Sequence, residues 1–296
     1  MGFLGLLVGL GLPLWGGSHV SPVLHAQIAL DRAGFSPGEI DGLAGANFER
    51  ALRGFQQQHR LTPTGKLDES TRAALHAIVA EPLVSVALTH EDVNGPFEKV
   101  PADPMEQGKL KALGFESAME ALGERYHVGP QLLRKLNEGR PLKPGVEWLV
   151  PDIGTPVTGR AATVEVSDTT KTMLVRNRAG KIIAQYPVTT GSEHDPLPIG
   201  TWKITGVYRN PDFFYNPDLF WDAQPHHAKT KIAPGPNNPV GVVWIDMNKE
   251  HYGIHGTPEP AQVGHVASHG CIRLTNWDAA ELAALVAKGV VVRLVK

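Results

Sequence analysis

The chain has 296 residues, of which 42% are hydrophobic and 24 are proline. This apolar content is sufficient for a core, and the length predicts two or three modules. The 28 Lys and Arg residues nearly balance the 30 Asp and Glu residues, so no long-range field attracts a polyanion. The composition therefore argues against nucleic acid as a partner.

The sequence contains one cysteine, Cys271, which cannot form an intramolecular disulfide. Free cysteines are among the most buried residue types, and composition alone favours an inert core residue. A reactive thiol is the alternative, and only the surrounding residues can decide between the two.

Residues 1–20 contain an apolar run from Phe3 to Trp15 that has the length of a signal-peptide core and is too short to span a bilayer. The run lacks a preceding Lys or Arg and a clear cleavage site, so a retained N-terminal anchor or a misassigned start codon stays open. We expect export to the periplasm or cell envelope, with membrane contact only through this segment if it is uncleaved.

Residues 21–80 show a helical pattern, with Phe48, Ala51, Leu52 and Phe55 spaced to lie on one helix face. Gly34, the Asp41-Gly42 turn and Gly65 divide the region into three short helices.

The Asp41-Gly42 turn, the Phe55-Gln56 pair and the TGKLD segment occur in an order that resembles the small peptidoglycan-binding domain of cell-wall enzymes. The resemblance implies that residues 21–80 bind the wall and perform no chemistry. A generic three-helix bundle is the alternative.

Residues 81–115 are rich in proline and polar residues and are expected to form a linker or irregular structure. Residues 116–152 contain two helical segments followed by PLKPGVEWLVPD and resemble a degenerate LysM module. In that module two helices pack on two short strands. A helix-turn-helix without a sugar-binding role is the alternative. The expected core residues are Leu122, Tyr126, Leu133 and Leu136.

Residues 160–296 change to a strand-like pattern of Val, Ile, Thr and aromatic residues bounded by Gly, Pro and Asn. A single helix is expected from the capping pattern at Thr275 to a stop at Gly289. Together the regions predict a multidomain α+β fold: a small helical bundle, a LysM-like middle module and a mostly β C-terminal domain with one capping helix.

The segment from Tyr208 to Pro239 is longer than an ordinary connection between strands. It is either a lid or substrate wall, or a loop that packs its aromatic side chains on the sheet. Those side chains are Phe213, Phe214, Tyr215 and Trp221.

The only cysteine stands in Ser268-His269-Gly270-Cys271, and His255-Gly256 precedes it at the end of an expected strand. This arrangement resembles the L,D-transpeptidase catalytic domain, or YkuD fold. Five further segments of the chain occur in the usual order of that family: VTTG, LPIGTW, RNPDFFYNP, GPNNPVG and the terminal strand.

A thiol with an ordinary pKa of about 8.5 needs a base or a positive partner to attack an amide. His255 is the expected base for Cys271. The resemblance implies that the backbone carbonyl of Gly256 orients the imidazole in place of a carboxylate side chain. The backbone N–H groups of His269, Gly270 and Cys271 are expected to form the oxyanion hole.

Three side chains around the cysteine have expected supporting roles. Ser268 and the His269 side chain are interpreted as supports for the loop. Arg273 either binds a stem-peptide carboxylate through its planar guanidinium or forms a structural salt bridge.

A zinc site made of His251, His255, His269 and Cys271 is a competing hypothesis. His251 and His255 would lie about 13 Å apart on a strand, which is too far for one ion. A non-catalytic wall-binding protein would require loss of the nucleophile or the base, and both are present. No cofactor or metal is expected, and His226, His227, His251 and His265 are interpreted as surface or loop residues.

The resemblance implies acyl transfer on peptidoglycan stem peptides through a Cys271 thioester, with release of D-alanine. The acceptor is an amine of a neighbouring stem (a 3-3 crosslink), an envelope lipoprotein or a free D-amino acid. With water as acceptor, the same Cys-His pair would act as an L,D-carboxypeptidase or endopeptidase. The sequence does not distinguish among these acceptors.

Overall fold

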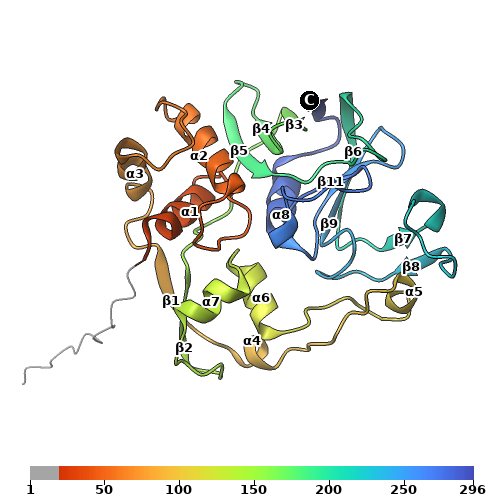
Figure 1. Ribbon diagram of the computed structural model, residues 1–296, viewed down its shortest axis with the longest axis horizontal. Helices are drawn as coiled ribbons and strands as arrows, with labels where there is room; N and C mark the ends of the chain where they lie inside the picture. Colours follow the sequence, from red (N-terminus) through yellow and green to blue (C-terminus); the bar gives the residue numbers. More distant parts are fainter. Residues whose placement is uncertain (1–19) are drawn as a thin grey trace, which may run out of the picture.

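A computed structural model describes residues 20–296 of the chain (Figure 1). The expected signal peptide or anchor therefore lies outside the described residues, apart from Val20. No helix in the described part of the chain has both the length and the apolar character needed to cross a membrane.

The described chain contains eight α-helices and twelve strands. The helices are α1 (Pro22–Arg32), α2 (Ala46–Gln58), α3 (Glu69–His76), α4 (His90–Asn94), α5 (Pro104–Gln107), α6 (Ala118–Arg125), α7 (Pro130–Leu136) and α8 (Asn276–Leu285). The strands are β1 (Leu83–Ala87), β2 (Glu147–Pro151), β3 (Thr163–Ser167), β4 (Thr172–Arg176), β5 (Ile182–Pro187), β6 (Gly200–Arg209), β7 (Phe213–Tyr215), β8 (Thr230–Ile232), β9 (Val243–Met247), β10 (Gly253–His255), β11 (Ile272–Arg273) and β12 (Val291–Val295).

The first three helices form the expected N-terminal bundle. The side chains of Phe48, Ala51, Leu52 and Phe55 are all buried on one side of α2, as their spacing predicted. Ser21 caps α1 by accepting a 3.1 Å hydrogen bond from the Leu24 amide. Capping satisfies one of the free amides at the helix start and fixes where the helix begins.

The middle of the chain differs from the expected linker followed by a separate module. Residues 83–87, within the expected linker, form β1 and pair antiparallel with β2 from Leu83↔Pro151 to Ala87↔Glu147. This pairing satisfies backbone groups that each segment would otherwise leave open. Helices α6 and α7 pack against the pair, with Leu122 and Leu133 buried at the centre and Tyr126 partly buried beside them. Leu136, in contrast, packs towards α1.

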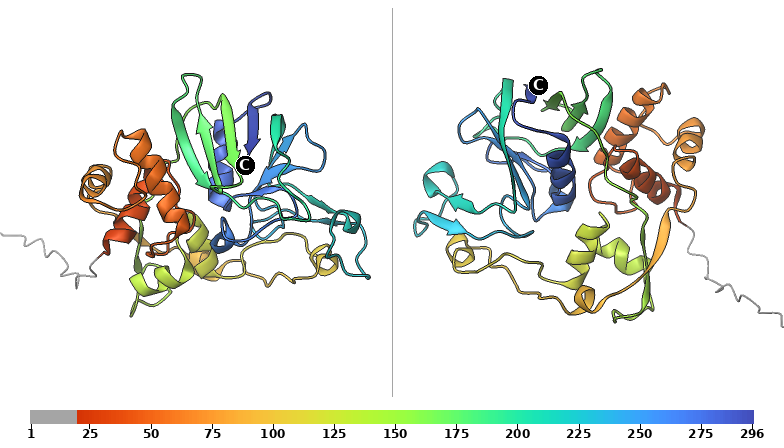
Figure 2. Two further views of the ribbon diagram at one scale, coloured as in Figure 1. Left: turned by 45° about the horizontal axis from the view of Figure 1, so that its top comes forward. Right: turned by 180° about the vertical axis from the view of Figure 1, so that it is seen from behind.

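Residues 95–115 leave this region and return to it, and we call them the strap. In Figures 1 and 2 the strap runs from α4 to α5 beneath the large sheet and back to α6. It contacts the C-terminal domain, because the Leu113 amide donates a 2.9 Å hydrogen bond to the Pro234 carbonyl. A strap that leaves its own module to reach a distant loop is not predicted by the linker composition.

The C-terminal domain is built on an eight-stranded sheet in the order β11-β10-β9-β6-β12-β3-β4-β5. The sheet curls around α8, whose buried side chains join one core with both halves of the sheet (Figure 2). The observed architecture confirms the expected multidomain α+β fold, with a helical N-terminal region and a mostly β C-terminal domain.

Helix α8 begins where expected but ends earlier than Gly289. Thr275 caps it by accepting from the Asp278 amide, and the chain becomes extended at Val286. The Asp278 carboxylate does not complete the predicted capping box. It accepts a 3.0 Å hydrogen bond from Ser36 in the N-terminal bundle.

The N-terminal bundle covers an edge of the sheet. Strand β5 lies at that edge, and Gln185 on it exchanges backbone hydrogen bonds of 2.7 and 2.9 Å with Gly34 and Ser36. Its side chain also donates to the Arg50 carbonyl at 2.8 Å. Unpaired edge strands can associate with strands of other chains, so the bundle protects β5 by covering its backbone edge.

A buried polar junction joins the bundle, the middle module and α8. His127 forms a 2.9 Å ion pair with Asp31 and stacks on Trp277. Burial raises the pKa of Asp278 from its ordinary 3.8 to about 8, and the nearby Asp31 carboxylate adds to the rise. Burial opposes the charge on His127, but Asp31 outweighs it and raises the pKa of that imidazole.

The junction predicts that stability falls as pH rises. A carboxyl whose folded pKa is raised stabilises the fold fully below its unfolded pKa, here near 3.8, and loses that contribution as pH rises through about 8. The raised pKa of His127 acts in the same direction above its ordinary 6.5. The free energy of unfolding, measured with urea at pH 5, 6.5 and 8, should decrease with rising pH for the wild type and decrease less steeply for Asp278→Asn. The exposed control Asp218→Asn should keep the wild-type slope. Parallel slopes for all three proteins would contradict this account.

Candidate active site

Two short parallel strands place three of the expected site residues on one face of the sheet. Strands β10 and β11 pair with Ile254 opposite Ile272 and His255 opposite Arg273. Side chains alternate between faces along a strand, so His255 and Arg273 lie on one face, and Cys271 lies on that face two residues before Arg273. All three side chains line the same cavity.

His255 is held by the backbone of the residue that follows it. Its Nδ1 lies 2.6 Å from the Gly256 carbonyl oxygen, which is the contact that the family resemblance implied. A carbonyl only accepts, so Nδ1 carries the proton and Nε2 has a free lone pair. A side chain at Gly256 would place Cβ 2.2 Å from Asn276 Oδ1, which explains the glycine at this position. Trp244 stacks on the imidazole with ring centroids 5.5 Å apart.

The cysteine and the histidine are both neutral at rest. Burial lowers the pKa of His255 to about 3, the Arg273 cation lowers it further, and the bond to Gly256 opposes both. Burial also raises the pKa of the Cys271 thiol above its ordinary 9.0, opposed by a backbone hydrogen bond from Gly253 and by Arg273. A thiol and a neutral imidazole are therefore present together without a preformed ion pair.

The loop before Cys271 has a fixed shape. Ser268 Oγ donates a 2.6 Å hydrogen bond to the Cys271 carbonyl, and the Ser268 amide donates to Thr190 at 2.8 Å. Gly270 adopts φ +103°, and a Cβ there would lie 2.9 Å from the Tyr252 ring. The amides of His269 and Gly270 donate to no backbone carbonyl within residues 20–296. They are available to an incoming oxygen.

Arg273 has no ion pair with any carboxylate in the described part of the chain, and its buried Nε has no hydrogen-bond partner there. Burial lowers the pKa of this guanidinium, and the nearby Cys271, Glu259 and Asp222 groups oppose that shift. Of the two sequence hypotheses for Arg273, the structural salt bridge is not formed. A guanidinium that faces a cavity with unused donors suits a ligand carboxylate.

The cavity has a volume of about 1150 Å³ and is open to solvent on one side. Residues 208–239, which we call the wall segment, form one side of it. Their β7 and β8 pair only with each other in a small separate sheet. Phe214 and Trp221 are 72% and 61% exposed, whereas Tyr215 is buried. The segment therefore stands as a wall beside the large sheet, and its aromatic side chains do not pack flat on it.

His269 connects the cysteine loop to the wall segment. Its Nε2 lies 3.0 Å from Asp222 Oδ1, and its ring packs against Phe220 and Trp221. The hypothetical zinc set of His251, His255, His269 and Cys271 does not gather. His269 turns towards Asp222, and His251 lies beside Glu250 at 3.5 Å.

Sequence reasoning missed three residues of the site: Asp222, Trp244 and Tyr252. Trp244 lies opposite His255 in the β9–β10 pair, so the alternation of strand VWIDM could have placed it in the cavity. Asp222 could not have been found, because only the fold brings the wall segment to His269.

Comparison with known protein families gives two matches within the chain. Residues 161–294 match the family described as the L,D-transpeptidase catalytic domain, and residues 19–75 match the putative peptidoglycan binding domain. The putative L,D-transpeptidase YkuD of Bacillus subtilis is 30% identical over 149 residues, which cover 50% of this chain and 74% of that protein. The probable L,D-transpeptidase YbiS of Escherichia coli K12 is 26% identical over 179 residues, 56% of each chain.

Solved structures of L,D-transpeptidases align with part of this chain. An L,D-transpeptidase from Mycobacterium smegmatis is 18% identical with a TM-score of 0.37, covering 52% of this chain and 75% of its own. The catalytic domain of the Enterococcus faecium L,D-transpeptidase is 20% identical with a TM-score of 0.35, covering 45% and 95%. From the identity with YkuD and the match over residues 161–294, this chain belongs to the L,D-transpeptidase family.

Proposed function

We propose that this protein is an L,D-transpeptidase of peptidoglycan stem peptides that uses Cys271 as nucleophile and His255 as base. The observation that carries the proposal is the common face of Cys271, His255 and Arg273 in one cavity, with the His255 tautomer fixed by Gly256. No other cysteine is available to the chain.

The neutral resting pair sets the order of proton transfers. His255 Nε2 takes the proton from Cys271 Sγ as the sulfur attacks the carbonyl carbon of the third stem residue. The amide C–N bond breaks, and His255 returns the proton to the departing D-alanine amine. A thioester results. An acceptor amine then attacks it, gives its proton to His255, and the C–S bond breaks to restore the thiol.

The Gly270 loop stabilises the oxygen that becomes negative during each attack. The free amides of His269 and Gly270, with that of Cys271, point from a loop whose shape Gly270 and Ser268 fix. Preorganised donors of this kind commonly lower the barrier by several kcal/mol, roughly 3 for each donor. Arg273 supplies the fixed positive charge that binds a carboxylate of the stem peptide.

The N-terminal bundle supports the same substrate class, because residues 19–75 match a putative peptidoglycan binding domain. We propose that residues 21–80 hold the enzyme on the wall, that residues 116–152 together with β1 form a LysM-like module, and that the protein acts outside the cytoplasm. Attachment to an envelope lipoprotein and formation of 3-3 crosslinks are the acceptor reactions that the proposal includes.

Product analysis tests the proposed reaction. Full-length protein incubated with a disaccharide-tetrapeptide should release D-alanine and form crosslinked dimers that mass spectrometry resolves. Cys271→Ala should fold normally and release none, Cys271→Ser should retain at most a trace, and His255→Ala should lose on the order of a hundredfold in rate. Tripeptide without dimer would favour the carboxypeptidase, whereas D-alanine release by Cys271→Ala would refute the nucleophile.

Two glycines with similar backbone angles form a matched test of the oxyanion loop. Gly270→Ala adds strain at φ +103° and a contact with Tyr252, whereas Gly289→Ala at φ +93° meets no atom within 4 Å. Each should cost on the order of 1–3 kcal/mol of stability. Only Gly270→Ala should also slow acylation of Cys271 by the tetrapeptide substrate, by at least about tenfold, because a displaced donor should cost less than the roughly hundredfold or more for complete loss of one donor. Equal acylation rates in the two variants would show that the loop shape does not matter.

A further inference from the structure

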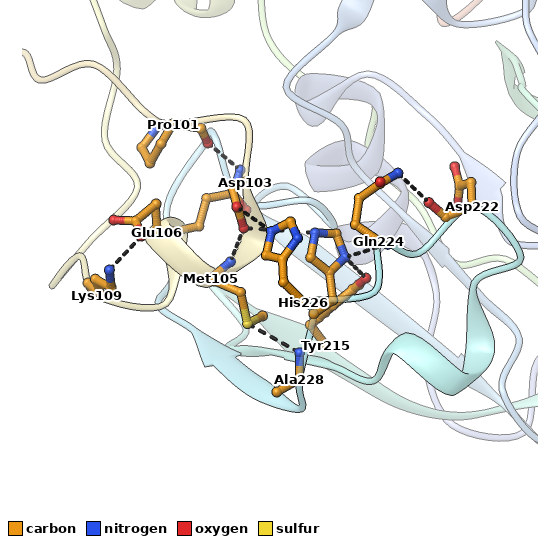
Figure 3. Close-up of polar contacts among 12 residues, drawn as sticks. Pro101, Asp103, Met105, Glu106, Lys109, Tyr215, Asp222, Gln224, His226 and Ala228 are labelled. Atoms are coloured by element: carbon orange, nitrogen blue, oxygen red, sulfur yellow. Dashed lines mark hydrogen bonds and ion pairs between the residues drawn. The ribbon is translucent and has the colours of Figure 1, made fainter.

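A second cluster of potential ligands lies at the contact between the strap and the wall segment. Asp103 precedes α5 in the strap, and His226 and His227 follow each other in the wall segment (Figure 3). One ligand atom from each of the three lies within 4.8 Å of the other two. Sequence reasoning left both histidines as surface or loop residues, because nothing in the sequence connects them to Asp103.

The spacing of the three donors suits one small cation. His226 Nε2 lies 2.9 Å from Asp103 Oδ2, and His227 Nε2 lies 3.9 Å from Asp103 Oδ1. Zinc bonds to imidazole and carboxylate of roughly 2.0–2.2 Å separate neighbouring ligands in a tetrahedron by roughly 3.3 Å. The two observed separations lie on both sides of that value, but they involve different oxygens of the Asp103 carboxylate. Ligation of one ion by a single Asp103 oxygen therefore requires a side-chain rotation.

The outer contacts of His227 support ligation through Nε2. Tyr215 Oη lies 2.7 Å from His227 Nδ1 and can accept a hydrogen bond from a protonated Nδ1, which leaves the Nε2 lone pair for a metal. The Gln224 amide, 3.2 Å from the same nitrogen, loses its acceptor in that tautomer. Gln224 is exposed, so water replaces the lost bond at small cost. The His227 side chain is only 10% exposed, which fixes its position, while His226 at 62% leaves the site accessible.

The cluster joins two parts of the chain that already pack together. Leu113 of the strap is buried with Tyr215 and Ile232 of the wall segment, and the Ala228 amide donates to Met105 Sδ at 3.3 Å. Figure 3 shows Met105 and Ala228 beside Asp103 and His226. Pro104, Tyr215 and His227 also line the cavity that contains Cys271. An ion at the cluster would therefore fix the wall of the active-site cavity.

We propose that Asp103, His226 and His227 bind one Zn²⁺ ion, with water at the fourth position, and that the ion ties the strap to the wall segment. Two imidazoles and a carboxylate with an open position are a common zinc ligand set. Three protein ligands with an open fourth position are more typical of catalytic zinc. We assign a structural role here because the ligands come from the strap and the wall segment and include neither Cys271 nor His255. The proposal is independent of the transfer reaction.

Zinc titration of the full chain tests the site. The parent protein for all variants should be untagged Cys271→Ala, because it lacks the active-site thiol, which could otherwise compete for the metal. Calorimetric titration with ZnCl₂ and native mass spectrometry should show one ion for each chain. His226→Ala and Asp103→Asn in this background should abolish saturable binding, and Tyr215→Phe should weaken it by roughly ten- to a hundredfold. His90→Ala, which removes an exposed histidine elsewhere, should bind as the parent does.

Hydrogen exchange tests the structural role separately from binding. Zinc should slow amide exchange in β7 and β8 of the parent and leave it unchanged in Asp103→Asn. Absence of saturable binding by the parent, or binding that survives both His226→Ala and Asp103→Asn, would overturn the site. Zinc bound at one ion per chain with no change in exchange would overturn the tie between strap and wall segment.

Discussion

The parallel pairing of β10 with β11 is the constraint on which the site depends. Its register sets His255 opposite Arg273 and, through strand alternation, brings Cys271 to the same face. A shift by one residue would turn Cys271 and Arg273 towards the core on the other side of the sheet. Leu274 and Thr189 help to hold this register, because the Leu274 amide bonds to His255 and Thr189 exchanges two bonds with Arg273.

Burial gives this pair its chemical character. The same burial that keeps His255 neutral also keeps Cys271 protonated, so neither group is charged before substrate arrives. In the proposed reaction, charge develops only during attack, next to Arg273 and the free amides of the loop. A neutral thiol at rest is less open to oxidation than a permanent thiolate, which suits an enzyme that we place outside the cytoplasm.

The parts of the chain outside the large sheet contact the C-terminal domain on two sides. The N-terminal bundle covers the edge of β5 and meets α8 at a junction of buried carboxyl groups and His127. The strap reaches the opposite end of the domain and packs on the wall segment. Removal of either part would therefore disturb more than wall binding, because both contact the catalytic domain directly.

Much of this architecture was predictable from local pattern. The helical face of Phe48 to Phe55 and the strands of the C-terminal domain follow from residue spacing, whereas the Gly256 contact of His255 was implied by the family resemblance. What depended on tertiary contact was not predictable. Residues 83–87 have too weak a pattern to be identified as a strand without their partner β2, and Asp278 carries a capping signature yet turns to Ser36. Asp222 pairs with His269, 47 residues away in the sequence, and Asp103 pairs with His226, 123 residues away.

The central claim is that Cys271 is an activated nucleophile beside an oxyanion hole, and intact-protein mass spectrometry after exposure to a carbapenem tests it most directly. A carbapenem contains a strained cyclic amide that an activated thiol can open to a thioester, which persists when deacylation is slow. The account predicts one adduct on the wild-type protein and none on Cys271→Ala. An unmodified wild-type mass after prolonged exposure, or an equal adduct on Cys271→Ala, would contradict it.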